Sequence, residues 1–286
     1  MNRLKPFRLW IAAFLLIGLG SLALAQIVIR RPNGQLVIIN DDEGRPMRNG
    51  VPDWQLKDHM PDDAFTFVRL RYDNYGRGAG WRTDYPDSDL NFSLRLQELT
   101  SMEVNPDGKI LDIMDEELFD YPWAYMIEPG DIYISDEEAI TMRKWMDNGG
   151  FLMVDDFWGD YEWEGFDSGF LQKVFPDKKW VEIELDHPIF NCVFTIDKKP
   201  QVPALGNAIR YRDQGITWEF QKPNAKDPHY RAMFDDDGRM VCFICFNTDL
   251  GDGWEREGED KWYFETFAEK QAYPLGINVI FYSLTH

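Results

Sequence analysis

The sequence has few cysteines and histidines and a shortage of positive charge. Its 286 residues include three cysteines and four histidines, and 30 lysines and arginines face 50 aspartates and glutamates. A net charge of −20 repels phosphate backbones and anionic lipid headgroups. The composition therefore argues against a nucleic-acid partner and favours basic, neutral or cation-bridged partners. Internal repeats and low-complexity tracts are also absent from the sequence.

The C-x-x-C pair of Cys242 and Cys245 has a spacing that can mark a redox or metal site. Both cysteines lie inside the apolar run from Met240 to Phe246, which predicts a buried strand. Side chains three residues apart on a strand point to opposite faces of the sheet. We therefore expect two separate core thiols, without a shared metal or a mutual disulfide.

The N-terminal segment has a basic start and then an apolar run from Leu9 to Ala25 that ends in small residues. This pattern predicts a signal peptide over residues 1–25, cleaved before Gln26, and an exported protein in the periplasm or outside the cell. The run is shorter than the roughly 20 apolar residues that a spanning helix needs. The alternative is a membrane anchor through residues 9–25. No cysteine follows the run, which excludes a lipid-anchored cysteine.

Residues 26–63 are expected to form a small hairpin around Pro32-Asn33-Gly34, followed by a proline-containing linker. Residues 64–286 then alternate short apolar runs with segments of helical spacing, which predicts an α/β domain with a doubly wound, mostly parallel sheet and flanking helices. A late antiparallel hairpin and a buried terminal helix complete the expectation. The predicted strands are Phe65–Tyr72, Ile110–Ile113, Trp123–Ile127, Phe151–Val154, Val181–Leu185, Tyr230–Phe234 and Met240–Phe246.

The strongest site prediction is Asp155-Asp156, with Trp158 two residues further on, directly after the buried strand Phe151–Val154. In open α/β sheets ligands bind at the carboxyl ends of strands. Two adjacent carboxylates are costly to bury unless a cation, a base or a shared proton offsets them. The pattern leaves a metal or acid/base site and a solvated capping loop as open alternatives.

Other polar residues follow predicted strands and are expected at the same edge of the sheet. They are Glu128, Asp186, His187, Asn247 and Asp249. Carboxylates with one imidazole suit a divalent cation or a proton shuttle. For His187 alone, a structural hydrogen-bonding role is the alternative.

Two loops add further ligand-binding predictions. The glycine-rich stretch from Tyr75 to Gly80 does not open a helix directly, which argues against a nucleotide cradle. It predicts a loop over the strand ends, from which Arg82 and Asp84 can reach a ligand. The acidic stretch from Gly251 to Asp260 carries Trp254, which is predicted to stack on a sugar ring or to pin a charged surface loop.

Several motifs between about Phe65 and His286 give the chain a family resemblance. It resembles a bacterial family known as domain of unknown function 4159, which is similar to the class I glutamine amidotransferase-like, flavodoxin-like fold. The motifs that carry the resemblance are Leu118–Pro122, Ser135–Glu138, Gly149–Asp156 with Gly159, Val174–Pro176, Asp186–Ile189, Gly251–Gly258 and Tyr273–Asn278.

The resemblance implies a nucleophilic cysteine on a sharp elbow after the Gly149-Gly150 turn, as in true amidotransferases. This chain has neither cysteine nor serine from Asp155 to Tyr161, which disfavours thiolate chemistry. Relatives encoded beside envelope systems with AAA-type ATPases and von Willebrand-type domains imply a role in an exported assembly.

Two functions follow as hypotheses. The first is a noncatalytic ligand-binding or assembly module of the cell envelope, with an envelope protein or a glycan as its partner. The second is a hydrolase or lyase acting on an envelope glycan or peptide, with Asp155, Asp156 and His187 in acid, base or metal roles. The sequence requires no cofactor, although a divalent cation suits the carboxylates. Contact with a membrane is expected only through an uncleaved signal segment.

Overall fold

The computed structural model describes residues 28–30, 36–38, 45–57, 63–76 and 79–286. The predicted signal peptide lies outside these ranges, as does the turn of the N-terminal hairpin. The two strands of that hairpin, β1 (Val28–Arg30) and β2 (Leu36–Ile38), pair antiparallel as predicted. Within the described residues, no helix combines the length and the apolar character that crossing a membrane requires.

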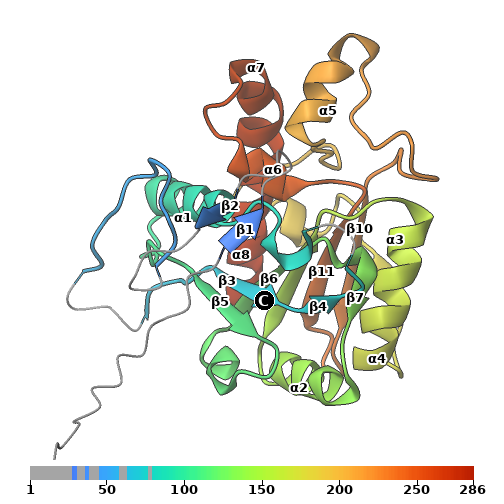
Figure 1. The fold of residues 1–286 in the computed structure, drawn as a ribbon. Coiled ribbons are helices and arrows are strands. Elements are labelled where there is room, and N and C mark those ends of the chain that lie inside the picture. Colours follow the sequence, from blue (N-terminus) through green and yellow to red (C-terminus); the bar gives the residue numbers. More distant parts are fainter. Residues whose placement is uncertain (1–27, 31–35, 39–44, 58–62, 77–78) are drawn as a thin grey trace, which may run out of the picture.

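A seven-stranded sheet forms the centre of the main domain, in the order β5-β3-β6-β8-β11-β10-β9 (Figure 1). Strands β5, β3, β6, β8 and β11 run parallel to one another, whereas β10 is antiparallel to both β11 and β9. The predicted mostly parallel sheet and its late hairpin are therefore confirmed. The strands are β3 (Val68–Arg71), β5 (Lys109–Asp112), β6 (Trp123–Ile127), β8 (Phe151–Asp155), β9 (Val181–Glu182), β10 (His229–Phe234) and β11 (Met240–Phe246), and a separate pair is β4 (Asp73–Asn74) with β7 (Ile132–Tyr133).

Helices cover both faces of the sheet, as the doubly wound class requires (Figure 1). One face packs against α1 (Asp87–Leu99), α6 (Leu250–Glu255), η8 (Phe264–Ala272) and α8 (Tyr273–Thr285). The other packs against α2 (Asp136–Asp147), α3 (Gly159–Phe166), η5 (Asp167–Leu171) and α4 (Gln172–Val174). The shorter helices are η2 (Gly80–Arg82), η3 (Glu116–Asp120), η4 (Pro129–Asp131), η6 (Pro188–Phe190), α5 (Leu205–Arg210), η7 (Arg212–Gln214) and α7 (Lys261–Tyr263).

Strand β11 shows how one apolar run supplies both faces of the core. Cys242 packs in the cluster under α2, and Cys245 packs in the cluster under α8. Both thiols are free and fully buried, so the prediction that they point to opposite faces is confirmed. Burial raises the pKa of each thiol, which keeps the sulfur in its inert protonated form.

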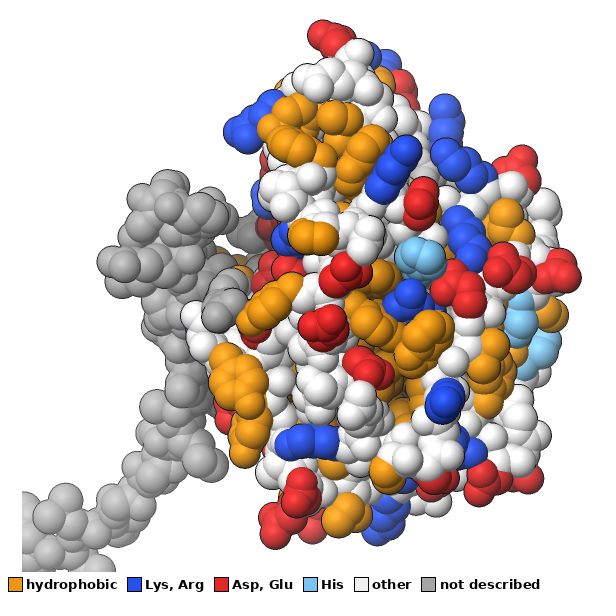
Figure 2. Space-filling view, turned by 90° about the vertical axis from the view of Figure 1, so that its right-hand side faces the viewer, with side chains coloured by type: hydrophobic (Ala, Val, Ile, Leu, Met, Phe, Trp, Pro, Cys, Tyr) orange, Lys and Arg blue, Asp and Glu red, His pale blue; other side chains and the backbone are white. Residues whose placement is uncertain are grey.

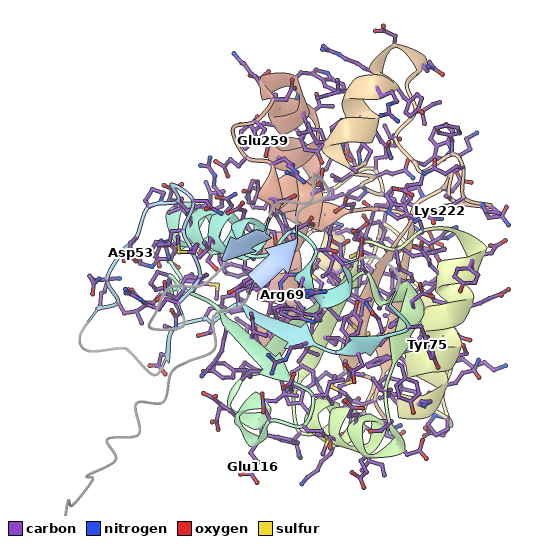
Figure 3. All side chains as sticks on the ribbon, in the orientation of Figure 1. Asp53, Arg69, Tyr75, Glu116, Lys222 and Glu259 are labelled. Atoms are coloured by element: carbon purple, nitrogen blue, oxygen red, sulfur yellow. The ribbon has the colours of Figure 1, made fainter. Side chains whose placement is uncertain are left out.

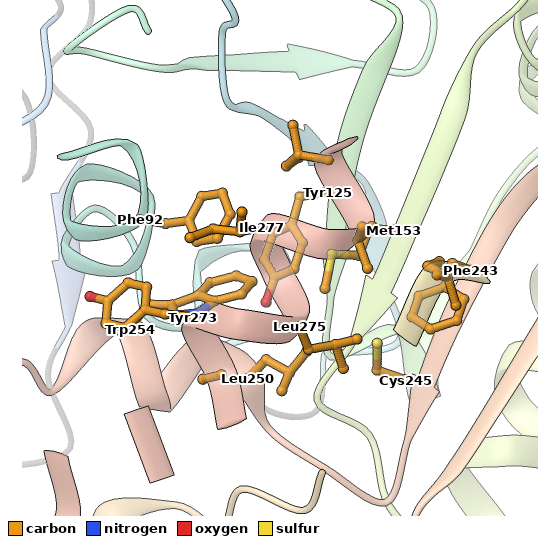
Figure 4. Close-up of a cluster of buried hydrophobic side chains, with 14 of the residues drawn as sticks. Phe92, Tyr125, Met153, Phe243, Cys245, Leu250, Trp254, Tyr273, Leu275 and Ile277 are labelled. Atoms are coloured by element: carbon orange, nitrogen blue, oxygen red, sulfur yellow. The ribbon is translucent and has the colours of Figure 1, made fainter. Parts of the chain in front are cut away.

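The segment after β11 corrects one prediction in part. The first half of the expected charged surface loop belongs to the buried helix α6, whereas residues 256–259 form an exposed or half-buried turn. Trp254 on this helix is fully buried, with its ring centroid 4.5 Å from that of Phe92 (Figure 4). Gly253 allows the close approach of η8, since a Cβ there would lie 2.6 Å from the Cβ of Ala272. Trp254 is therefore a core residue and is not available to a ligand.

The edge of the sheet departs from the prediction as well. The helical chain before this edge begins at Gly159 and runs through α3, η5 and α4. The strand expected over Val181–Leu185 is only the two-residue edge strand β9. The chain leaves the sheet after Glu182, and this departure carries His187 away from the strand ends.

Candidate functional site

An acidic cavity of about 380 Å³ lies at the carboxyl edge of the parallel strands. Glu128 follows β6, Asp156 follows β8, and Asp249 lies three residues beyond β11. Among the described lining residues, Lys222 is the only base. It is labelled on the right-hand side of Figure 3. The lining is Thr83, Asp84, Glu128, Gly130, Asp131, Asp156, Trp158, Glu162, Ala204, Glu219, Lys222, Asp249 and Asp252.

The backbone is strained at four residues in or next to this lining. Asp84, Glu128, Asp156 and Asn247 have φ angles of +62°, +49°, +54° and +61°, in the left-handed region that non-glycine residues rarely adopt. Such conformations cost free energy and persist where the surrounding structure imposes them, most often at functional sites. Four such residues at the carboxyl edge of one sheet mark this edge as a candidate functional site.

Three carboxylates from separate parts of the chain converge in the cavity. One oxygen from each of Asp84, Asp156 and Asp249 lies within 4.8 Å of the other two. Asp156 Oδ1 accepts a hydrogen bond of 3.0 Å from Trp158 Nε1, and Asp249 Oδ1 accepts one of 2.7 Å from the Asp252 N–H. Asp84 Oδ2 is buried without a hydrogen-bond partner among the described residues. We call these three residues the aspartate triad.

The electrostatics of the triad favour uptake of positive charge. Burial raises the pKa of Asp84, Asp156 and Asp249 well above the ordinary range, and repulsion from neighbouring carboxylates adds to each shift. Across the described part of the chain, no lysine or arginine forms an ion pair with any of the three. A proton or a bound cation would relieve this repulsion.

A second grouping, Asp84 with Asp252 and Glu255, also has oxygens within 4.8 Å of one another. There the charge is already offset, because Arg256 lies 3.2 Å from Asp252 Oδ1 and 2.7 Å from Glu255 Oε2. Asp252 Oδ2 also accepts a hydrogen bond of 2.5 Å from the Leu205 N–H. The aspartate triad is therefore the better place for a cation.

The triad suits a hard cation. The atoms that the triad offers to a cation are carboxylate oxygens. No histidine or cysteine is among the described residues that line the cavity. Calcium, magnesium and manganese prefer such oxygen donors, whereas zinc is usually held by nitrogen and sulfur. Glu128 lines the same cavity and accepts a hydrogen bond of 2.9 Å from the Gly80 N–H through Oε2.

Asp155 lies beneath the cavity and does not line it. Its side chain is fully buried, and Oδ2 accepts hydrogen bonds of 2.9 Å from the Tyr125 hydroxyl and from the Gly251 N–H. Burial raises the pKa of Asp155 to about 7, although these hydrogen bonds oppose the shift. Of the adjacent pair predicted from the sequence, Asp156 thus faces the cavity and Asp155 supports it from below.

Asn247 ties together two walls of the cavity. Its Oδ1 accepts a hydrogen bond of 2.8 Å from the Gly159 N–H, at the start of α3. Its Nδ2 donates hydrogen bonds of 2.9 Å to the carbonyl oxygens of Asn224 and Asp227. Because the amide is occupied on both sides, Asn247 positions the chain and has no free group for a ligand.

The structure does not bring every predicted residue to the cavity. His187 Nδ1 accepts a hydrogen bond from the Ile189 N–H, and its ring centroid lies 5.3 Å from that of Tyr282, at the far end of α8. Arg82 is exposed and lies beside Trp81, outside the cavity lining. The expected convergence therefore holds for Glu128, Asp156 and Asp249 and fails for Asp186 and His187, which do not line the cavity.

Several cavity residues were missed from the sequence. Lys222 Nζ lies 2.7 Å from Glu162 Oε1 and 3.1 Å from Glu219 Oε2, and it links a loop to α3. These residues follow no predicted strand, so nothing in their spacing marked them. Asp252 had one local signal, because an aspartate three residues after Asp249 is typical of a capped helix start.

Comparison with known proteins identifies a family that covers almost the whole main domain. A search among curated proteins returned no match. A protein-family model described as "Domain of unknown function (DUF4159)" matches residues 66–284, which are most of the chain and include every residue of the aspartate triad. The chain therefore belongs to the DUF4159 family.

Proposed function

We propose that this chain is an exported, noncatalytic binding domain of the cell envelope whose aspartate triad holds a divalent cation. The observation that carries the proposal is the convergence of Asp84, Asp156 and Asp249, with oxygens within 4.8 Å of one another and no paired base among the described residues. Ligand oxygens would complete the coordination of the cation. Figure 2 shows acidic and hydrophobic side chains next to one another on the right-hand face of Figure 1.

A cation fits this site better than a large basic group. The triad oxygens lie close enough for one ion to touch all three, and the unpartnered Asp84 Oδ2 is buried. A buried carboxylate without a partner is costly, and several together are costlier because like charges repel. A divalent ion offsets that cost at a single point.

The export part of the proposal is supported by the sequence alone. The basic start, the apolar run from Leu9 to Ala25 and the small residues before Gln26 form a signal-peptide pattern. A thiol enzyme is disfavoured, because Asp155 to Tyr161 contains no cysteine or serine and Cys242 and Cys245 are buried in the core.

A metal-assisted hydrolase acting on an envelope glycan or peptide is the second function that we consider. The observation in its favour is that burial raises the pKa of two separate carboxyl groups, Asp155 and Glu255, to about 7, where a general acid or base works best. Neither group lines the cavity, however, and His187 supplies no imidazole there. Binding is therefore the function that the geometry supports better.

Calorimetric titration with calcium, magnesium, manganese and zinc tests the proposal. We expect a hard cation to bind wild type at one site and to raise its melting temperature. Asp156→Asn should lose that binding yet keep or slightly raise the melting temperature in chelator, because the substitution relieves repulsion. Asp186→Asn changes an exposed aspartate outside the cavity lining; it is the matched control and should behave as wild type.

Absence of cation binding to wild type, together with a much lower melting temperature for Asp156→Asn in chelator, would show that Asp156 is a structural hydrogen-bond acceptor. The cation site and the hydrolase hypothesis that depends on it would both then be abandoned. Release of sugar or amino acid from envelope glycans or peptides only when the cation is present would favour the hydrolase over the binding domain.

A further inference from the structure

Three exposed tyrosines outside the cavity lining lie around Asp131, which is part of it. Tyr75, Tyr133 and Tyr161 have relative exposures of 72%, 47% and 56%, although aromatic side chains of this size usually bury most of their surface. We call them the tyrosine rim. Tyr75 is labelled on the right-hand side of Figure 3, as is Lys222.

Asp131 connects the rim to the cavity. It lines the cavity, its carbonyl oxygen accepts a hydrogen bond of 3.1 Å from the Tyr75 N–H, and its Oδ1 accepts one of 3.3 Å from the Tyr161 hydroxyl. The ring centroids of Tyr75 and Tyr133 lie 5.6 Å apart, with the rings tilted by 59°. Tyr75 on the chain after β4 and Tyr161 on α3 are therefore both tied to a residue of the cavity lining. Tyr133 on β7 packs against Tyr75, and Lys173 Nζ lies 5.0 Å from the Tyr133 ring centroid.

The cation site has room for ligand oxygens. Calcium takes six to eight oxygen ligands, and one oxygen from each of three carboxylates leaves at least three positions open to a ligand. A ligand that fills them from the cavity mouth needs neutral oxygens, because the other charged groups of the lining are acidic apart from Lys222. It also needs an apolar face to cover the rim.

We propose that the ligand of this cavity is an uncharged glycan. Neighbouring hydroxyl groups of one sugar complete the coordination of the cation, and the apolar face of an adjoining ring stacks on the tyrosine rim. This inference rests on the proposed cation site and adds the ligand class. The repulsion from the acidic lining disfavours uronic acids and phosphorylated sugars, so neutral chains are the ones selected.

Binding of chito-, cello- and manno-oligosaccharides to the full mature chain, with calcium and then with chelator, tests the inference. Wild type should bind at least one of these neutral chains in calcium and lose it in chelator. Tyr75→Ala/Tyr133→Ala should weaken that binding by about tenfold or more while leaving calcium affinity unchanged. Phe119→Ala, an exposed aromatic on η3 outside the cavity lining, is the control and should bind as wild type.

Calcium binding without binding of any of these neutral chains overturns the glycan inference and leaves the cation site intact. Binding of a basic peptide at the same site in place of a glycan overturns it too. Equal glycan affinity in wild type and in the double variant contradicts the claim that the glycan stacks on the tyrosine rim. A wild type that does not bind calcium at all contradicts the proposed function itself, so the two failures are distinct.

Discussion

Arg69 donates a hydrogen bond of 2.8 Å to the carbonyl oxygen of Thr83, the residue that precedes Asp84. The same guanidinium nitrogen also donates one of 2.9 Å to the carbonyl oxygen of Trp81. Arg69 is fully buried, and its Nε donates a hydrogen bond of 2.9 Å to Asp89 Oδ2 on α1. Strand β3, which carries Arg69, thus fixes the backbone that presents the first member of the triad.

The first prediction concerns this anchor. Arg69→Met leaves the Asp89 carboxylate buried and uncompensated, so it should lower the free energy of unfolding by about 3–5 kcal/mol. Arg69→Met/Asp89→Leu should recover much of that loss, yet both variants should bind calcium more weakly because Asp84 is no longer held. Urea unfolding and calcium titration measure the two effects. Calcium affinity equal to wild type in the double variant would show that Arg69 does not position Asp84.

The second prediction is a pH dependence of stability. The pKa of Asp155 and of Glu255 is raised to about 7 in the folded chain, whereas an unfolded carboxyl titrates near 4. The folded state therefore holds more protons between these values, and stability present below about pH 4 is lost as the pH rises towards 7. In chelator the protein should unfold at lower urea concentration at about pH 8 than at about pH 5.

Two comparisons make the pH test specific. Asp155→Asn should flatten the dependence, because one of the groups that takes up a proton on folding is gone. Calcium should also reduce the dependence, since the pKa values of the triad carboxyls are raised too and a bound ion would displace the protons that they take up on folding. A stability that rises steadily from about pH 5 to pH 8 in chelator would contradict the raised pKa values.

Much of this cavity could be predicted from local patterns. Short apolar runs located β6, β8 and β11, and in a parallel sheet the residues that follow such strands meet at one edge. That reasoning found Glu128, Asp156 and Asp249. It also identified Asp84 from the loop after β3, although only the structure shows that Asp84 enters the cavity and that Arg82 stays outside.

The misses have physical causes that spacing does not reveal. The acidic neighbours of Trp254 predict a surface position, but glycines in α6 let that helix pack closely and bury the indole. His187 follows an apolar run, yet that run joins the sheet only as the edge strand β9 before the chain turns away. Lys222 reaches the cavity from a loop whose path is set by Asn247, and such long-range ties leave no local pattern.

The third prediction concerns the thiols. Cys192 is exposed, whereas Cys242 and Cys245 are fully buried on opposite faces of β11. Alkylation of the native protein without reductant should label Cys192 alone, and labelling in denaturant should add the other two. Mass spectrometry of the peptides decides this. A linked Cys242–Cys245 peptide would contradict the strand geometry.

The fourth prediction is that the mature protein begins at Gln26. Ala23 and Ala25 supply the small residues that a signal peptidase recognises. N-terminal sequencing or intact mass of protein recovered from the cell envelope checks it. If Met1 to Ala25 are retained, the chain is membrane-anchored and the export step of the proposal must be revised.

The fifth prediction addresses the cation site itself, through terbium as a luminescent substitute for calcium. The Trp158 indole donates its hydrogen bond of 3.0 Å to Asp156 Oδ1, so an ion bound to the triad lies close enough to receive excitation energy from this ring. Trp158→Phe should keep calcium affinity and lose most of the sensitised emission. Asp186→Asn should match wild type.

Tryptophan-excited terbium emission, titrated into wild type, Asp156→Asn and Asp249→Asn, is therefore the most direct test that the aspartate triad binds a hard cation. The account predicts a saturable emission from wild type that calcium displaces, and its loss in both aspartate variants while they remain folded. Emission that is absent from wild type, or that persists unchanged when Asp156 and Asp249 are neutralised, would contradict it.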